Sequence, residues 1–155
     1  MAWQNLPSTS TPINATNLNS LSNSIEEGSW TPVIAALSET APTVTYSRQF
    51  GRYKKIGSIV FFRFNIRAKI TALNGTNNYA VINGLPYEAT ASALGDYAFT
   101  FGALYSAVND YTNATMCPYS NYLRVQGNYG ASAIKWVVTA TSYMEIAGSG
   151  FYFTS

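Results

Sequence analysis

The sequence predicts an all-β fold, an antiparallel β-sandwich or jelly-roll-like domain that follows a short N-terminal helix. From Ser29 onward, apolar and polar residues alternate with a period of two, as in strands that bury one face. Clusters of Gly, Pro and Asn separate these runs at short intervals. The composition agrees, because Tyr 12, Phe 8 and Trp 3 favour strands while only 10% of the residues are charged.

The N-terminal residues predict an extended leader. Residues 1–13 contain two prolines and show no hydrophobic periodicity. Such a segment is ordered only through contact with neighbouring chains. We therefore divide the chain into residues 1–28, an attachment and trimerisation segment, and residues 29–155, a β-sandwich head domain.

A short helix is predicted after the leader. Asn14 or Thr16 is a suitable N-cap, and Gly28 is a suitable residue to end the helix. Apolar residues at spacings of three and four share one helical face: Leu18, Leu21 and Ile25. A helix of about ten residues is too short to be stable alone in water. The apolar stripe packs either on its own domain or on two further copies about a three-fold axis, and we favour the homotrimer.

Strands are expected in order along the head domain. The clearest is Ile59–Ile70, in which every second residue from Val60 is apolar and the residues between are mostly polar or charged. We also expect a break at Gly51, and a bulge where Gly148 and Gly150 reset the apolar parity of the last strand. The other candidates lie between turn clusters: Trp30–Ala36, Thr43–Phe50, Arg52–Ile56, Tyr79–Asn83, Ala98–Ser106, Ala114–Cys117, Tyr122–Asn128, Ala133–Thr139 and Tyr143–Thr154.

The polar face of the longest strand carries a charged row, formed by Arg63, Arg67 and Lys69. One interpretation is a face exposed to solvent, where such charges add little stability. The other is a surface that meets carboxylates or carbonyls of a neighbouring subunit. The sequence leaves both interpretations open.

The charge of the chain argues against some partners. A net charge of +2 is small, and the nine Lys and Arg residues are spread along the chain rather than clustered as in a nucleic-acid footprint. No apolar run reaches the roughly 18 residues that a membrane span needs. The N-terminus also lacks the pattern of a signal peptide. We therefore expect no nucleic-acid partner and no membrane insertion.

The residues that usually carry catalysis are scarce. Without His, the common Ser-His-Asp and Cys-His systems and the commonest metal ligand are excluded. Cys117 is the single cysteine and precedes Pro118, which fits a buried apolar role. We expect no enzyme activity, no cofactor and no metal. The catalytic alternative is a glycosidase, which needs two carboxylates across a cleft, here from Glu88, Asp96 and Asp110.

Binding chemistry is concentrated between residues 105 and 129. Aromatic faces stack on the apolar C–H patches of sugars, and amides and carboxylates bond their hydroxyls. Loops on a rigid sandwich are common places for recognition, although Tyr on strands and Asn in turns also occur for structural reasons. We expect a glycan site among Tyr105, Asn109, Asp110, Tyr111, Tyr119, Tyr122, Asn128 and Tyr129.

Two blocks of sequence resemble bacteriophage tail-fibre, baseplate and related virion fibre proteins. Residues 5–19, NLPSTSTPINATNLN, look like the entry segment of such proteins, which often precedes a short helix of the Asn-x-Ile-Glu-x-Gly kind. A second block is similar in order and spacing to C-terminal β-domains of phage fibre and receptor-binding proteins: GSWTPV at 28–33, GRYKKIGSIV at 51–60, INGLP at 82–86 and GSGFYFT at 148–154. The resemblance implies a homotrimeric β-sandwich head on a virion fibre.

These observations lead to three functional hypotheses. The first is a virion protein whose N-terminal segment binds other virion proteins and whose head binds a glycan on the host cell surface. The second is a structural head or neck fibre, or a capsid decoration protein, without strong adhesion. It is favoured because the chain lacks shaft repeats and starts at its own Met1, so that we expect a small complete protein. The third is the fibre-borne glycosidase. Residues 87–147 match the family least well, and this is where such proteins vary.

Overall fold

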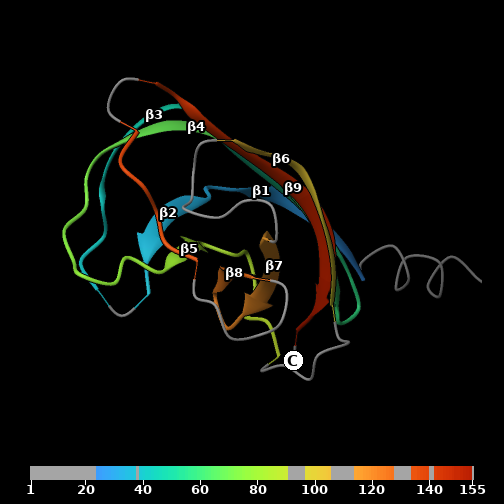
Figure 1. The fold of residues 1–155 in the computed structure, drawn as a ribbon. Helices are drawn as coiled ribbons and strands as arrows, with labels where there is room; N and C mark the ends of the chain where they lie inside the picture. The colour runs from blue at the N-terminus through green and yellow to red at the C-terminus, as the bar shows by residue number, and fades with distance from the viewer. Residues whose placement is uncertain are drawn as a thin grey trace, which may run out of the picture.

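The computed structural model describes residues 24–37, 39–90, 97–105, 114–127, 134–139 and 142–154, and Figure 1 shows their fold. Over these ranges the protein is all-β, with two antiparallel sheets and no helix, as the alternating sequence predicts. No helix that could span a membrane occurs within the described residues. The two-sheet arrangement is compatible with the predicted sandwich.

Nine strands are described, and they divide into a large and a small sheet. The large sheet has five strands in the order β1-β3-β4-β9-β6, and the small sheet has four in the order β2-β5-β8-β7. The bounds of the strands are β1 Ile25–Trp30, β2 Val33–Ala36, β3 Thr43–Ile56, β4 Ile59–Ala72, β5 Ala80–Asn83, β6 Tyr97–Tyr105, β7 Ala114–Tyr119, β8 Tyr122–Gly127 and β9 Met144–Phe153.

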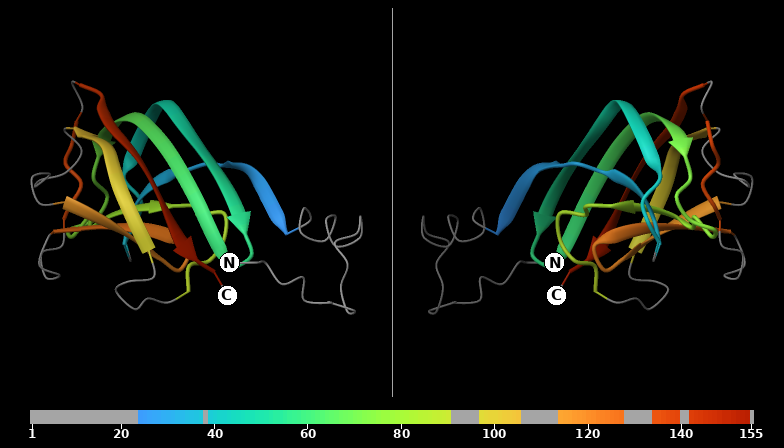
Figure 2. Two further views of the ribbon diagram at one scale, coloured as in Figure 1. Left: turned by 90° about the vertical axis from the view of Figure 1, so that its right-hand side faces the viewer. Right: turned by 90° about the vertical axis from the view of Figure 1, so that its left-hand side faces the viewer.

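The chain crosses repeatedly between the sheets and forms hairpins only within them. It leaves β1 for β2 at Thr31 and Pro32, where the missing N–H of proline ends strand pairing. The β3–β4 hairpin turns at Gly57, whose φ of 58° suits glycine. The β7–β8 hairpin turns at Ser120, with a φ of 50°. Both views in Figure 2 show the long strands β3, β4 and β9 arching beside the short strands.

One hydrophobic core joins the two sheets. The inner face of β4 is fully buried from Val60 to Ile70, with alternate exposed or half-exposed residues, which confirms the predicted parity. Residues from the small sheet, including Ile34, Ile82 and Leu123, belong to the same cluster. Trp136 is also buried in this core, and its indole Nε1 donates a hydrogen bond of 2.6 Å to the carbonyl oxygen of Ala35. The core therefore fixes the position of the opposite, outward face of the large sheet.

The end of the predicted N-terminal helix is wrong. Ile25 begins strand β1 and Gly28 lies inside it, so neither residue is helical. Pairing with β3 explains this, because Glu26 and Glu27 lie opposite Lys55 and Lys54. The strand thus also extends the head domain upstream of the expected boundary at residue 29. Leu18 and Leu21, the other members of the predicted stripe, lie outside the described residues.

Two predictions that rested on glycines within strands are wrong. Gly51 does not break β3, which runs unbroken from Thr43 to Ile56. Gly148 and Gly150 do not reset β9 either, since the β4–β9 register is continuous and Tyr152 keeps the inner parity. Gly51 leaves room for the ring of Trp30 in β1, and Gly148 leaves room for the ring of Phe99 in β6. A bulge does occur opposite β9, in β6 between Phe101 and Ala103.

The strand predicted at 133–139 is replaced by isolated pairing over the part that the structure describes. Lys135 forms a bridge with Tyr79, and the backbone N–H of Thr139 bonds to the carbonyl of Ile70 at 2.9 Å. Ile134 and Trp136 bury their side chains in the core. The alternation therefore reflects core packing without a full strand ladder.

Candidate binding site on the outer sheet face

The outward face of the large sheet is strongly basic. Strand alternation places six of the nine Lys and Arg residues of the chain on it: Arg48, Arg52, Lys54, Arg63, Arg67 and Lys69. Among the described carboxylates, only Glu27 and Glu145 lie on the same face. Although the net charge of the chain is only +2, this face therefore carries a large local excess of positive charge.

Two arginines face each other at the middle of this surface. Arg52 of β3 and Arg63 of β4 are directly paired in the strand register, and Ser149 of β9 continues the same row. Like charges directly opposite one another in a sheet are destabilising. No described carboxylate forms an ion pair with either arginine. Their described partner is the ring of Phe50, with guanidinium carbons 5.7 and 5.8 Å from its centroid.

An aromatic row lies two residues further along the same strands. Phe61 of β4 pairs with Phe151 of β9, with ring centroids 6.1 Å apart, and Lys54 of β3 continues the row. Phe61 is 45% exposed, unusual for so large an apolar side chain. Phe153 packs edge-on against Phe151 at 6.2 Å. This end of the face therefore offers flat aromatic surface to solvent.

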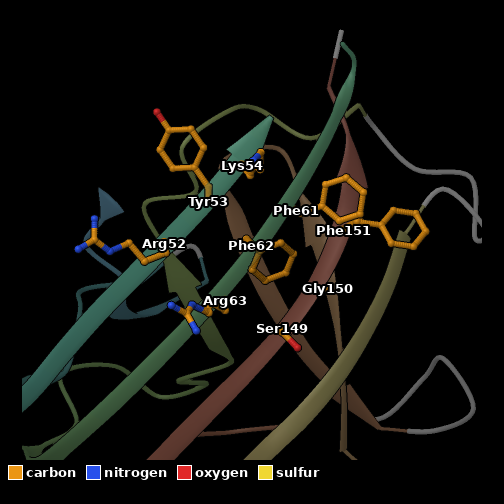
Figure 3. A pocket seen from close by; sticks show the side chains of 9 residues that line it. All are labelled: Arg52, Tyr53, Lys54, Phe61, Phe62, Arg63, Ser149, Gly150 and Phe151. Atoms are coloured by element: carbon orange, nitrogen blue, oxygen red, sulfur yellow. The ribbon is translucent and has the colours of Figure 1, made fainter. Parts of the chain in front are cut away.

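A shallow groove lies between the basic row and the aromatic row, as Figure 3 shows. Its volume is about 490 Å³. The floor is the backbone of Tyr53, Phe62 and Gly150, which occupy the register positions between the two rows. Arg52 and Arg63 also border a second hollow of about 410 Å³ that extends over β1. The arginines thus stand between two adjoining depressions.

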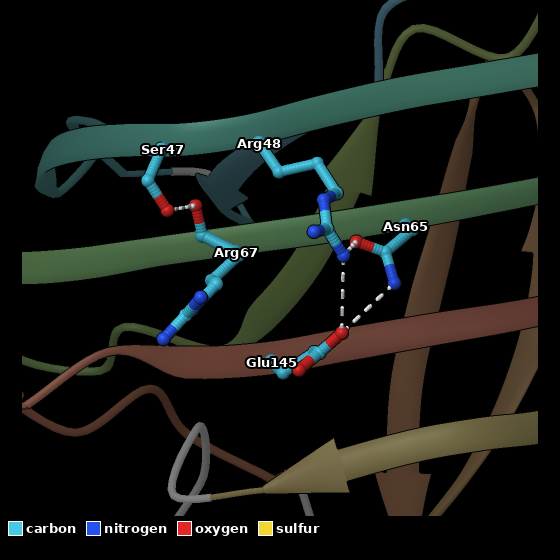
Figure 4. Close-up of polar contacts among 5 residues, drawn as sticks. All are labelled: Ser47, Arg48, Asn65, Arg67 and Glu145. Atoms are coloured by element: carbon cyan, nitrogen blue, oxygen red, sulfur yellow. Dashed lines mark hydrogen bonds and ion pairs between the residues drawn. The ribbon is translucent and has the colours of Figure 1, made fainter.

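The other cations of this face are partly compensated. Lys54 Nζ lies 3.6 Å from Glu27 Oε2. Arg48 Nη1 lies 3.7 Å from Glu145 Oε1, and Asn65 Nδ2 donates to the same oxygen at 3.0 Å, the network drawn in Figure 4. These exposed pairs add little stability. They do leave Arg52 and Arg63 as the cations beside the groove without an acidic partner in the described chain.

The charged row predicted on β4 is confirmed as an exposed or half-exposed row. Arg67 and Lys69 both lie over the ring of Tyr143, at 5.1 and 4.7 Å from its centroid. Arg63 belongs to the groove instead. Whether a neighbouring subunit covers part of this row stays a prediction.

The predicted tyrosine-rich site is described only in part. Tyr119 and Tyr122 are paired on either side of the β7–β8 turn, with ring centroids 5.5 Å apart, and Tyr119 is 44% exposed. Burial, the largest cause, raises the pKa of the Tyr122 hydroxyl. Tyr105 ends β6. Asn109, Asp110, Tyr111, Asn128 and Tyr129 lie outside the described residues.

A second polar cluster occupies the inner side of the edge strand β1. The Tyr53 hydroxyl donates to Glu26 Oε1 at 3.1 Å, and Lys55 Nζ lies 5.2 Å from the centroid of the Tyr87 ring. Hydrogen bonds from Tyr87 and then Tyr53 hold the pKa of the Glu26 carboxyl below its usual range. The same bond to Glu26 raises the pKa of Tyr87. These contacts connect Tyr87 to the edge of the large sheet.

The arrangement supports binding chemistry. No group of three or more His, Cys, Asp or Glu side chains that could hold a metal occurs within the described ranges. Cys117 is buried, as expected. Of the three carboxylates considered for a glycosidase, Glu88 accepts a bond of 2.8 Å from Ser120 Oγ, and Asp96 and Asp110 lie outside the described residues. The groove itself offers cations and aromatic rings, which are suited to binding.

The sequence analysis did not predict this groove, although the hairpin that joins Arg52 and Arg63 is local. It recognised the alternation of the β4 strand but did not pair that strand with β3 and β9. Only the register brings Arg52 beside Arg63 and Phe61 beside Phe151.

No protein-family model, curated protein or solved structure matches this chain.

Proposed function

We propose that this chain is a bacteriophage virion fibre or baseplate protein, a homotrimer whose head domain binds a glycan on the host surface. The observation that carries the proposal is the exposed groove between Arg52, Arg63 and the Phe61–Phe151 pair. Sugar-binding sites commonly combine aromatic faces with neighbouring hydrogen-bond donors. The leader at residues 5–19 and its resemblance to fibre entry segments support the assignment to a virion. In this proposal residues 1–23 attach the protein to the virion and include the short helix through which three copies associate.

Adsorption and glycan binding test the proposal together. The full chain should bind a subset of bacterial surface glycans on an array and adsorb to the corresponding cells. Phe61→Ala combined with Phe151→Ala should reduce both signals, because the sugar loses its stacking surface. Val138→Ala is the matched control, since Val138 is 51% exposed and does not line the groove. Failure of the intact protein to bind any host glycan or cell envelope would refute the receptor role.

A structural virion protein is the second candidate. Ile25 and Ile56 are paired across β1 and β3 and are 44% and 42% exposed, which suits a surface covered in an assembly. Immunogold labelling of particles separates the candidates. Label on tail or baseplate supports the receptor-binding assignment, whereas label on the capsid or neck supports a head fibre or decoration protein.

A further inference from the structure

The groove on the large sheet has the properties of a site for an acidic sugar. We propose that it binds an anionic saccharide, whose carboxylate or other acid group lies between Arg52 and Arg63 while a sugar ring stacks on Phe61 and Phe151. This inference rests on the proposed glycan-binding function and names the class of glycan.

The first argument is the opposed arginine pair. Arg52 and Arg63 occupy directly paired positions on β3 and β4, which costs stability without an intervening anion. Each guanidinium can bind an acid group through two parallel hydrogen bonds. Both residues are exposed and line the same groove, so a ligand can reach them from solvent. An acid group between the two arginines would offset their mutual repulsion and accept hydrogen bonds from both guanidinium groups.

The second argument is the distance between the two rows. Arg63 and Phe61 are two residues apart on β4, which separates the rows by roughly 7 Å along the strand. Phe151 and Ser149 repeat this spacing on β9. A single sugar residue with an acid substituent can therefore contact both rows at once. Ser149 adds an exposed hydroxyl beside Arg63 for a sugar hydroxyl.

The third argument is the charge of the whole face, which disfavours a second copy of this chain as the occupant. Six cations face solvent there against two described carboxylates, and both carboxylates already lie near Lys54 and Arg48. A second copy placed face to face would bring the same excess of positive charge. An anionic ligand is complementary to this surface.

The test compares acidic with neutral saccharides on the full chain. Isothermal titration is carried out with a hyaluronan tetrasaccharide, sialyllactose, glucose phosphate and neutral lactose. We expect at least one acidic sugar to bind while lactose does not, and we expect binding to weaken as salt is added. The carboxylated and phosphorylated sugars distinguish the two sources of the negative charge.

Substitutions locate the binding. Arg52→Gln and Arg63→Gln should each weaken the acidic sugar about tenfold or more, since each removes a charge-assisted contact. Arg67→Gln is the matched control, because Arg67 carries the same charge on the same face but lies over Tyr143, away from the groove. It should leave the affinity within about twofold, in line with long-range screening. Circular dichroism checks that each variant is folded.

The alternative outcomes are distinguishable. Equal binding of lactose and acidic sugars, unaffected by Arg63→Gln, would overturn the anionic class but preserve glycan binding. Equal losses from Arg67→Gln and Arg63→Gln, or equally strong binding of single-stranded DNA, would reduce the effect to general electrostatics and overturn the site. Absence of binding to every glycan would refute the proposed function itself. A change of mass in light scattering on Arg63→Gln, without sugar binding, would assign the face to a second copy.

Discussion

At the scale of single residues, the close approach of Trp30 to Gly51 explains a position that the sequence leaves ambiguous. The two residues are paired across β1 and β3. A Cβ atom at Gly51 would lie 2.5 Å from Trp30 Nε1, so only glycine leaves room for the indole. The ring in turn packs edge-on against Phe64, with centroids 5.8 Å apart. Gly51 therefore serves packing, and the strand continues through it.

This contact predicts the effect of adding one methyl group. Gly51→Ala should displace the Trp30 indole and destabilise the protein by about 1–3 kcal/mol, the usual cost of overpacking. Chemical denaturation monitored by tryptophan fluorescence measures the change. Gly102→Ala is the control, because its Cβ would meet Ala147 only at 3.8 Å, an ordinary contact. Equal stability of the two variants would contradict the packing role of Gly51.

At the scale of elements, alternation in the sequence predicts the strands well where one face is buried. The parity of β4 could be predicted because its inner residues are all apolar. Glycines were less informative, since a glycine in a strand can mark a break, a bulge or space for a ring. In β9, Gly148 accommodates the ring of Phe99, and the strand stays regular. Only the neighbouring strand shows which of the three applies.

The candidate site was harder to predict for the same reason. The eight residues expected to bind sugar come from one continuous stretch of sequence. The groove instead combines β3, β4 and β9, whose members are separated by up to about a hundred positions in the chain. The β3–β4 pairing is a local hairpin, but local spacing carries no information on the pairing of β4 with β9, because that pairing depends on the packing of the whole domain.

The turn before β5 shows how one side chain orders an element. The carboxylate of Glu39 accepts hydrogen bonds from the backbone N–H groups of Asn77, at 3.0 Å, and Asn78, at 2.8 Å. Asn78 has a φ of 41°, a conformation that needs local support. These hydrogen bonds, that from Asn78 first, hold the pKa of the Glu39 carboxyl below its usual value. The turn is thus tied to the segment that follows β2.

This turn predicts a dependence on pH. Because the folded-state pKa of Glu39 is lowered, its stabilisation is complete above the unfolded pKa and is lost as the pH falls through the folded value. Glu39→Gln should therefore lower the thermal midpoint at neutral pH, and the difference from the parent should shrink in acid. Glu27→Gln, which changes an exposed carboxylate that lies 3.6 Å from Lys54 Nζ, is the control. A difference that persists unchanged in acid would contradict the role of the charge.

At the scale of the whole molecule, the arrangement of the sheets concentrates charge that the composition disperses. A net charge of +2 describes the chain, but the outer face of one sheet carries three cations for each described carboxylate. The opposite face of that sheet is the apolar core. The long strands therefore place six of the nine cations on the face opposite the apolar core.

Assembly is the last property that the whole molecule predicts. If the chain forms the proposed homotrimer, deletion of residues 1–23, which leaves β1 intact, should shift the mass in multi-angle light scattering from three times the 16.9 kDa chain toward a monomer. Leu21→Asp should act in the same direction, because a charge on the predicted apolar stripe would oppose packing of the proposed helices. Ser20→Asp is the matched control, since Ser20 lies off that stripe. A trimer that survives both changes would move assembly to the β-domain, where the exposed pair Ile25 and Ile56 offers the nearest apolar surface.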